Sequence, residues 1–180
     1  MFFRTKEQAI QWVTDLRLDA AQLSAECVDE LAPNSIRIAL GESQVSPYAI
    51  AKAIAQALGN VPEICLWITE YGIWPSSENW HLYYTLRRTY GDLRKLGEAP
   101  AHLFLGYETT DLVTFLYLTL LFSWGGHVIS APSWTTVKIS HDGWIVIEAE
   151  HNRNEVIKLF TELGLRVEVR DSNSSVRRTQ

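Results

Sequence analysis

The chain has 180 residues, of which 47% are hydrophobic and 21% are charged, and its formal net charge is −5 at pH 7. This length suits one compact domain, and this composition is typical of a folded globular protein rather than a disordered chain. The acidic balance disfavours nonspecific binding to nucleic acid or to an anionic membrane surface, so we expect neither as a partner.

The polar start, the apolar runs and the cysteines together favour a cytoplasmic protein. Acidic and polar side chains such as Glu7 come too early for a secretory signal, and the longest apolar run, 112–122, is too short to span a bilayer. Cys27 and Cys65 lie inside apolar patterns and form no CxxC pair, which favours reduced, packed thiols.

The N-terminal part predicts a helical segment over about 5–32. Thr5 and Gln8 have the spacing of a capping box, in which the threonine hydroxyl accepts from the Gln8 amide and Gln8 reaches back. Apolar residues then recur at three- and four-residue spacing until Pro33 ends the pattern.

The next segments predict a strand at 35–40, a helix at 46–58 that ends at Gly59, and a strand at 64–68. The second strand is apolar on both sides, as expected in the middle of a sheet covered by helices. Because a strand, a helix and a strand follow one another, we expect two adjacent parallel strands joined by a right-handed crossover.

An aromatic turn and a helix follow the second strand. The helix is predicted to begin after a serine N-cap near Ser77 and to end at Gly91. Its spacing places Trp80, Tyr84 and Arg87 on a face of their own beside the core face.

The rest of the chain alternates strands and helices. The predicted elements are a strand at 102–105, a helix at 112–122, a strand at 127–130, a hairpin of 135–140 and 144–150 around an Asp-Gly turn, a helix from 152 to 164, and an edge strand at 165–170. The pattern as a whole predicts a single α/β domain over 1–170. Its mixed sheet would start with parallel βα units and end in an antiparallel hairpin and edge strand, with helices packed on it and a flexible polar tail at 171–180.

If the early strands are parallel, the loops that follow them meet at one edge of the sheet, where ligands of open α/β sheets bind. The residues collected there are acidic and aromatic, and they include no glycine-rich phosphate loop with a reachable lysine. Together with the outer helix face, they form the predicted binding surface: Glu42, Ser43, Glu70, Tyr71, Trp74, Trp80, Tyr84, Arg87 and Trp134.

We expect neither a cofactor nor a metal. The five histidines share no ligand spacing, and His141, at the hairpin turn, is expected to lie in solvent. Glu78 and His81 have an ExxH spacing, but a second ExxH motif is missing, so Glu78 is interpreted as a partner of the helix dipole.

The stretch from Trp67 to Gly91, together with the segments DLVTFLYL and SHDGW, resembles small uncharacterised bacterial proteins. This resemblance implies no activity and carries over no site residues.

Three functions remain as alternatives. The first is a non-catalytic cytoplasmic module that binds or inhibits another protein, such as an immunity-type protein that neutralises a bacterial toxin; it rests on the acidic, tryptophan-rich composition and the missing catalytic motif. The second is a small enzyme that uses Glu42 and Glu70 as acid and base, although solvated loop carboxylates are the more common reading. The third is a subunit that assembles with copies of itself.

Overall fold

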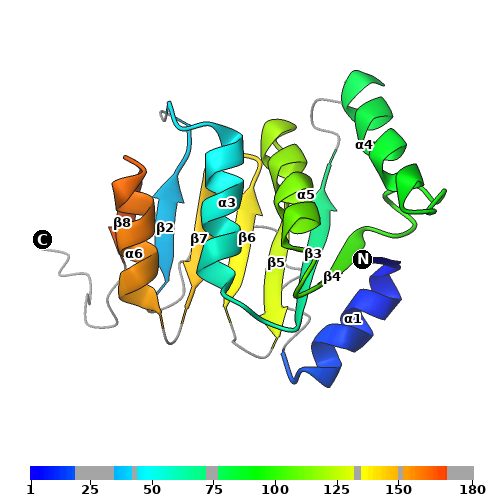
Figure 1. The fold of residues 1–180 in the computed structure, drawn as a ribbon, viewed down its shortest axis with the longest axis horizontal. Coiled ribbons are helices and arrows are strands. Elements are labelled where there is room, and N and C mark those ends of the chain that lie inside the picture. Colours follow the sequence, from blue (N-terminus) through cyan, green and yellow to red (C-terminus); the bar gives the residue numbers. More distant parts are fainter. Residues whose placement is uncertain (19–34, 42–43, 72–76, 132–134, 150–151, 170–180) are drawn as a thin grey trace, which may run out of the picture.

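The computed structural model describes residues 1–18, 35–41, 44–71, 77–131, 135–149 and 152–169. These residues form one eight-stranded sheet and five helices (Figure 1). The strands are β1 (Phe2–Arg4), β2 (Ile36–Ala39), β3 (Glu63–Glu70), β4 (Ala101–Leu105), β5 (Gly125–Ala131), β6 (Thr136–Ser140), β7 (Trp144–Glu148) and β8 (Arg166–Val169). The helices are α1 (Lys6–Asp15), α3 (Pro47–Leu58), α4 (Ser77–Thr89), α5 (Thr109–Leu121) and α6 (Arg153–Glu162).

The sheet is antiparallel throughout the described residues, so the predicted start with parallel βα units is wrong. The strand order is β1-β4-β3-β5-β6-β7-β2-β8, and every neighbouring pair runs antiparallel. Because β5, β6 and β7 lie between β3 and β2, these two strands still run in the same direction. The connection through α3 therefore gives β2 and β3 the same direction, as expected. The two strands are not neighbours, because β5, β6 and β7 lie between them.

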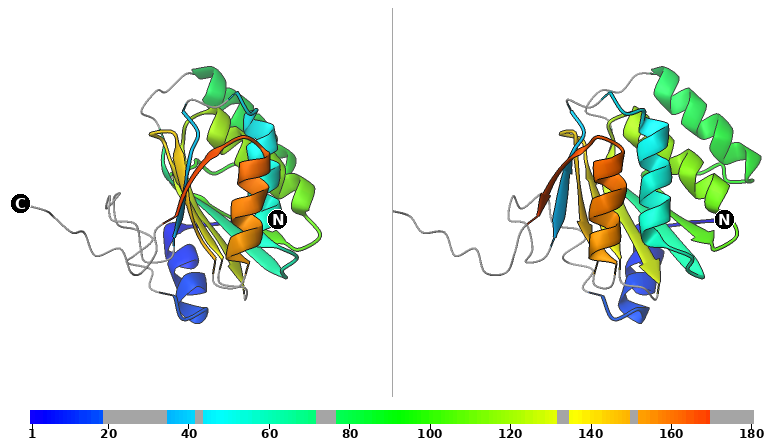
Figure 2. Two further views of the ribbon diagram at one scale, coloured as in Figure 1. Left: turned by 90° about the vertical axis from the view of Figure 1, so that its left-hand side faces the viewer. Right: turned by 60° about the vertical axis from the view of Figure 1, so that its left-hand side comes forward.

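The strands present alternate side chains to two different layers. Helices α3, α5 and α6 cover one face of the sheet, which we call the helix face (Figure 2). Ile64, Leu66 and Ile68 of β3 join the large core on that face. Cys65 and Trp67 point to the opposite face, the far face, where α1 packs against β3 and β4. The apolar character of β3 on both sides thus reflects burial under two layers.

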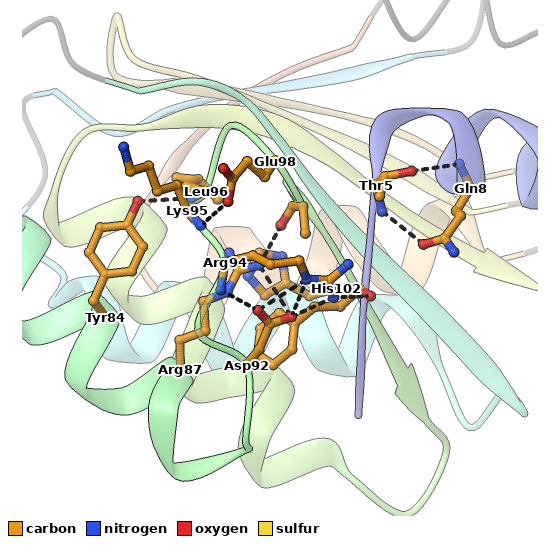
Figure 3. A network of polar contacts seen from close by, with 12 residues as sticks. Thr5, Gln8, Tyr84, Arg87, Asp92, Arg94, Lys95, Leu96, Glu98 and His102 are labelled. Carbon is orange, nitrogen blue, oxygen red and sulfur yellow. Dashed lines mark hydrogen bonds and ion pairs between the residues drawn. The ribbon is translucent and has the colours of Figure 1, made fainter.

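Several local features predicted from the sequence are present in the structure. The capping box is confirmed, since Thr5 Oγ1 accepts from the Gln8 amide and Gln8 Oε1 accepts from the Thr5 amide (Figure 3). The last strand, β8, lies at the edge as predicted. Strand β1, at the other edge, was missed because only three residues precede the helix signal. Cys65 is a buried free thiol.

Parts of several predictions lie outside the described residues. These are Cys27, the continuation of the N-terminal helical segment beyond residue 18, and the tail from residue 170 onward. Within the described part, no helix is both long and apolar enough to cross a lipid bilayer.

Candidate functional site

Three of the predicted binding residues lie together where β3 leads into α4. The rings of Trp80 and Tyr84 stack with centroids 5.7 Å apart and planes 14° apart, and Tyr71 meets Trp80 edge-on at 5.6 Å. Tyr71 is 36% exposed, while Trp80 and Tyr84 are half-buried. We call these three residues the aromatic ladder.

The aromatic ladder is held by contacts on several sides. The four-residue spacing of Trp80 and Tyr84 places both rings on one face of α4. The Tyr84 hydroxyl accepts from the Leu96 amide at 2.8 Å. Gly97 leaves room for the Tyr71 hydroxyl, since a Cβ at that position would lie 2.7 Å from it. These contacts fix the positions of the three rings relative to α4 and to residues 96–97.

Arg87 does not share this partly exposed position, although the sequence placed it on the same helix face. Its side chain is fully buried, and its guanidinium donates to the Ala99 carbonyl at 2.9 Å and to the Tyr83 hydroxyl at 3.1 Å. It also lies 4.4 Å from the ring centroid of Phe3 and 3.5 Å from Asp92. Arg87 therefore joins α4 to the core and to β1.

Arg87 belongs to a network of polar contacts that runs into the sheet (Figure 3). Asp92 accepts from Arg94, whose Nη2 also donates to the Phe3 carbonyl at 3.0 Å. Burial alone would raise the pKa of Asp92, but the hydrogen bonds from Arg94 and the charges of Arg87 and Arg94 hold it below its ordinary value. Most polar atoms of the network are paired within it, with Nε of Arg87 as an exception, and this pairing indicates a structural role.

The inner end of this network is a neutral histidine on the helix face. His102 Nδ1 donates to the Leu66 carbonyl at 3.2 Å, and its Nε2 accepts from the Tyr83 hydroxyl. Burial, reinforced by the charge of Arg87, lowers the pKa of His102 to about 3.

A second polar group lies on the far face at the end of β3, around Glu70. The register of β3 against β5 shifts between Ile68 and Glu70, which opposes Glu70 to Gly125. Without this bulge, strand alternation would place Glu70 on the helix face, as it does Ile68. With the bulge, the Glu70 carboxylate lies over Gly125, and a Cβ atom at position 125 would come 2.3 Å from Glu70 Oε2. The bulge thus turns Glu70 toward the far face.

Glu70 is paired there with His141 of the β6–β7 turn. The distance from His141 Nδ1 to Glu70 Oε2 is 2.7 Å, and His141 Nε2 lies 3.2 Å from Asp142 Oδ1. His141 and Glu70 are 30% and 28% exposed. The expectation that His141 lies free in solvent is therefore wrong; the partner, 71 positions away, is brought close by the strand order.

The remaining predicted residues, Glu42, Ser43, Trp74 and Trp134, lie outside the described residues. The predicted pair of Glu42 and Glu70 therefore stays a prediction. Gly41, which precedes Glu42, does lie at the same end of the sheet, since a Cβ on Gly143 would be 3.5 Å from its Cα.

Within the described part of the chain, no three or more histidine, cysteine, aspartate or glutamate side chains are grouped so that they could hold a metal ion. Comparison with protein-family models, with curated protein sequences and with solved structures finds no match.

Proposed function

We propose that the protein is a non-catalytic cytoplasmic module that binds or inhibits another protein, and that the aromatic ladder and the outer face of α4 form its contact surface. An immunity-type protein that neutralises a bacterial toxin belongs to this class. The observation that carries the proposal is the partly exposed cluster in which Trp80 stacks on Tyr84 and meets Tyr71 edge-on.

Rigid aromatic rings suit this role because little conformational entropy is lost when a partner covers them. Leu82, on the outer side of α4 and not on the side of the Trp80 and Tyr84 rings, is 49% exposed and adds apolar area that a partner would bury. The net charge of −5 favours a basic partner, because opposite charges steer association.

The proposal is tested by placing a photo-crosslinking amino acid at Leu82 in the full chain and irradiating native host cells. The same substitution at Lys158, an exposed residue of α6, is the matched control. We expect a discrete protein adduct from position 82 and none from position 158. The purified partner should then bind Leu82→Arg at least about tenfold more weakly than the unaltered protein.

Absence of any adduct at position 82, or an identical adduct at both positions, would contradict the proposal. Equal affinity of the partner for the unaltered protein and for Leu82→Arg would remove α4 from the contact surface.

A second candidate function, acid–base catalysis, is favoured by one observation, the pairing of Glu70 with His141 at 2.7 Å. A carboxylate that orients an imidazole is the arrangement from which a histidine takes up a proton. This candidate requires that any turnover found in an activity screen fall by about a hundredfold or more in Glu70→Gln, with stability unchanged. Turnover that survives this substitution would exclude it.

A further inference from the structure

One row of side chains crosses the far face and contains three basic residues, His127, Lys138 and Arg37. In the register of the sheet, Trp67 of β3 opposes His127 of β5, and His127 opposes Lys138 of β6. Val146 of β7 lies between Lys138 and Arg37 of β2. Directly opposed residues on one face of an antiparallel sheet have Cβ atoms about 5 Å apart. His127 and Lys138 can therefore contact the same chemical group of a ligand.

His127 is a buried polar group without a partner. It is 7% exposed, and neither ring nitrogen makes a hydrogen bond or ion pair within the described part of the chain. The His127 nitrogens are not among the fully buried, unsatisfied side-chain atoms of the described residues, so they retain contact with solvent. Because the imidazole has no protein partner and its nitrogens contact solvent, they are available to a ligand.

The two cations of the row also lack carboxylate partners among the described residues. Lys138 and Arg37 instead flank the indole of Trp144, with Nζ 5.9 Å and Cζ 5.2 Å from the ring centroid. The residues directly opposite Trp144 are the small Ala39 and Ser140, which leaves the space beside the indole to the two cations. Glu168 of β8 lies directly opposite Arg37, whereas the residues directly opposite Lys138 are His127 and Val146, so Lys138 has no carboxylate across from it.

We propose that His127 and Lys138 form a binding site for an oxyanion, the carboxylate or phosphate group of a small molecule, with Trp144 as its wall and Arg37 as a second positive charge. An imidazole N–H and an ammonium group on adjacent strands supply two donors that an oxyanion accepts in charge-assisted hydrogen bonds. The site does not depend on the aromatic ladder, so it stands whether or not the protein binds a partner through α4.

The charges around His127 give the site a characteristic pH dependence. Burial, reinforced by the Lys138 charge and opposed by Glu70, lowers the pKa of His127 to about 4. Other charged groups on this face among the described residues are the Glu70–His141 pair, Asp142, Glu148 opposite Thr136, and Glu168 opposite Arg37. A bound anion adds negative charge beside the imidazole, so binding should raise the pKa of His127, and affinity should increase as the pH falls.

The test is a titration of the full chain with inorganic phosphate and, separately, with acetate, at constant ionic strength. The readout is the nuclear magnetic resonance signal of the His127 ring, followed over pH with and without the anion. We expect a saturable shift of this signal and a raised pKa. The tighter of the two probes identifies the ligand as a phosphate or a carboxylate.

Two variants and a control complete the experiment. Lys138→Met, which keeps an unbranched apolar side chain but removes the charge, should weaken binding about tenfold, because one charge-assisted hydrogen bond is lost. Lys52→Met on α3 is the matched control, since Lys52 also lies over an aromatic ring, that of Tyr48 at 5.9 Å, and should change nothing. His127→Gln should remove the part of the pH dependence that comes from the imidazole and leave only the part that comes from ionisation of the anion itself. If neither anion moves the His127 signal, or if Lys52→Met weakens binding as much as Lys138→Met, the proposal is overturned.

Discussion

At the scale of single residues, the charge of Arg87 shows how spacing can place a side chain on the wrong side of a helix. The sequence put Arg87 on the face of Trp80 and Tyr84, and a positive charge on a helix is usually solvated. In the fold its partners are Asp92 and the Ala99 carbonyl, which follow the helix, and Phe3 from the distant strand β1. None of these contacts leaves a periodic signal in the sequence.

We expect Arg87→Met to lower the free energy of unfolding by about 2–4 kcal/mol, because it leaves the Tyr83 hydroxyl and the Ala99 carbonyl without their donor. Asp92 keeps its ion pair with Arg94, which limits the loss. The neighbouring Arg88 is exposed, so Arg88→Met should change stability by less than about 0.5 kcal/mol. Urea-induced unfolding measures both variants, and equal losses would contradict the buried role of Arg87.

At the scale of elements, the helices and strands themselves could largely be predicted from the sequence, but the order of the strands in the sheet could not. Amphipathic spacing and turn signals gave the helix at 46–58 and the hairpin around Asp142-Gly143 close to their observed positions. A helix between two strands constrains their direction only, and nothing in the sequence showed that β3 would use both edges for β4 and β5. The pairing of Glu70 with His141 depends on that order, so it could not be predicted either.

The two glycines at the start of β5 should respond differently to an added methyl group. In Gly126→Ala the new Cβ would lie 2.4 Å from the Trp67 carbonyl oxygen, which is backbone and cannot move away, so we expect a loss of about 3 kcal/mol. In Gly125→Ala the nearest atom is Glu70 Oε2, at the end of a flexible side chain, so the loss should be about 1 kcal/mol. Thermal unfolding of both variants tests the order, which the reverse ranking would refute.

At the scale of the whole molecule, two histidines buried on opposite faces of the sheet make the fold sensitive to acid. The pKa of His102 is lowered to about 3 and that of His127 to about 4, from ordinary values of 6.5. The unfolded chain therefore binds protons at a higher pH than the folded chain does. Their contribution to stability is complete above about pH 6.5 and is lost as the pH falls toward the folded values.

We expect the free energy of unfolding to decrease below about pH 6.5 by up to about 1.4 kcal/mol per pH unit for each of these histidines. In His102→Gln the new side-chain amide can accept from the Tyr83 hydroxyl and donate to the Leu66 carbonyl. This variant should therefore lack the contribution of His102 to the pH dependence of the free energy of unfolding. Urea titrations at a series of pH values measure it. A slope that stays the same in both His102→Gln and His127→Gln would show that other groups cause the acid sensitivity.

The hydrogen bond from Arg94 to the Phe3 carbonyl also bears on how the protein behaves at high concentration. An open sheet ends in two strands whose unpaired backbone groups can recruit strands of other molecules. Here one edge is the three-residue strand β1, with a carbonyl occupied by Arg94, and the other is β8, with the exposed charges of Arg166 and Glu168. The short strand with an occupied carbonyl and the charged strand both disfavour pairing with a strand of another molecule. The eight-stranded sheet is therefore expected to resist edge-to-edge aggregation.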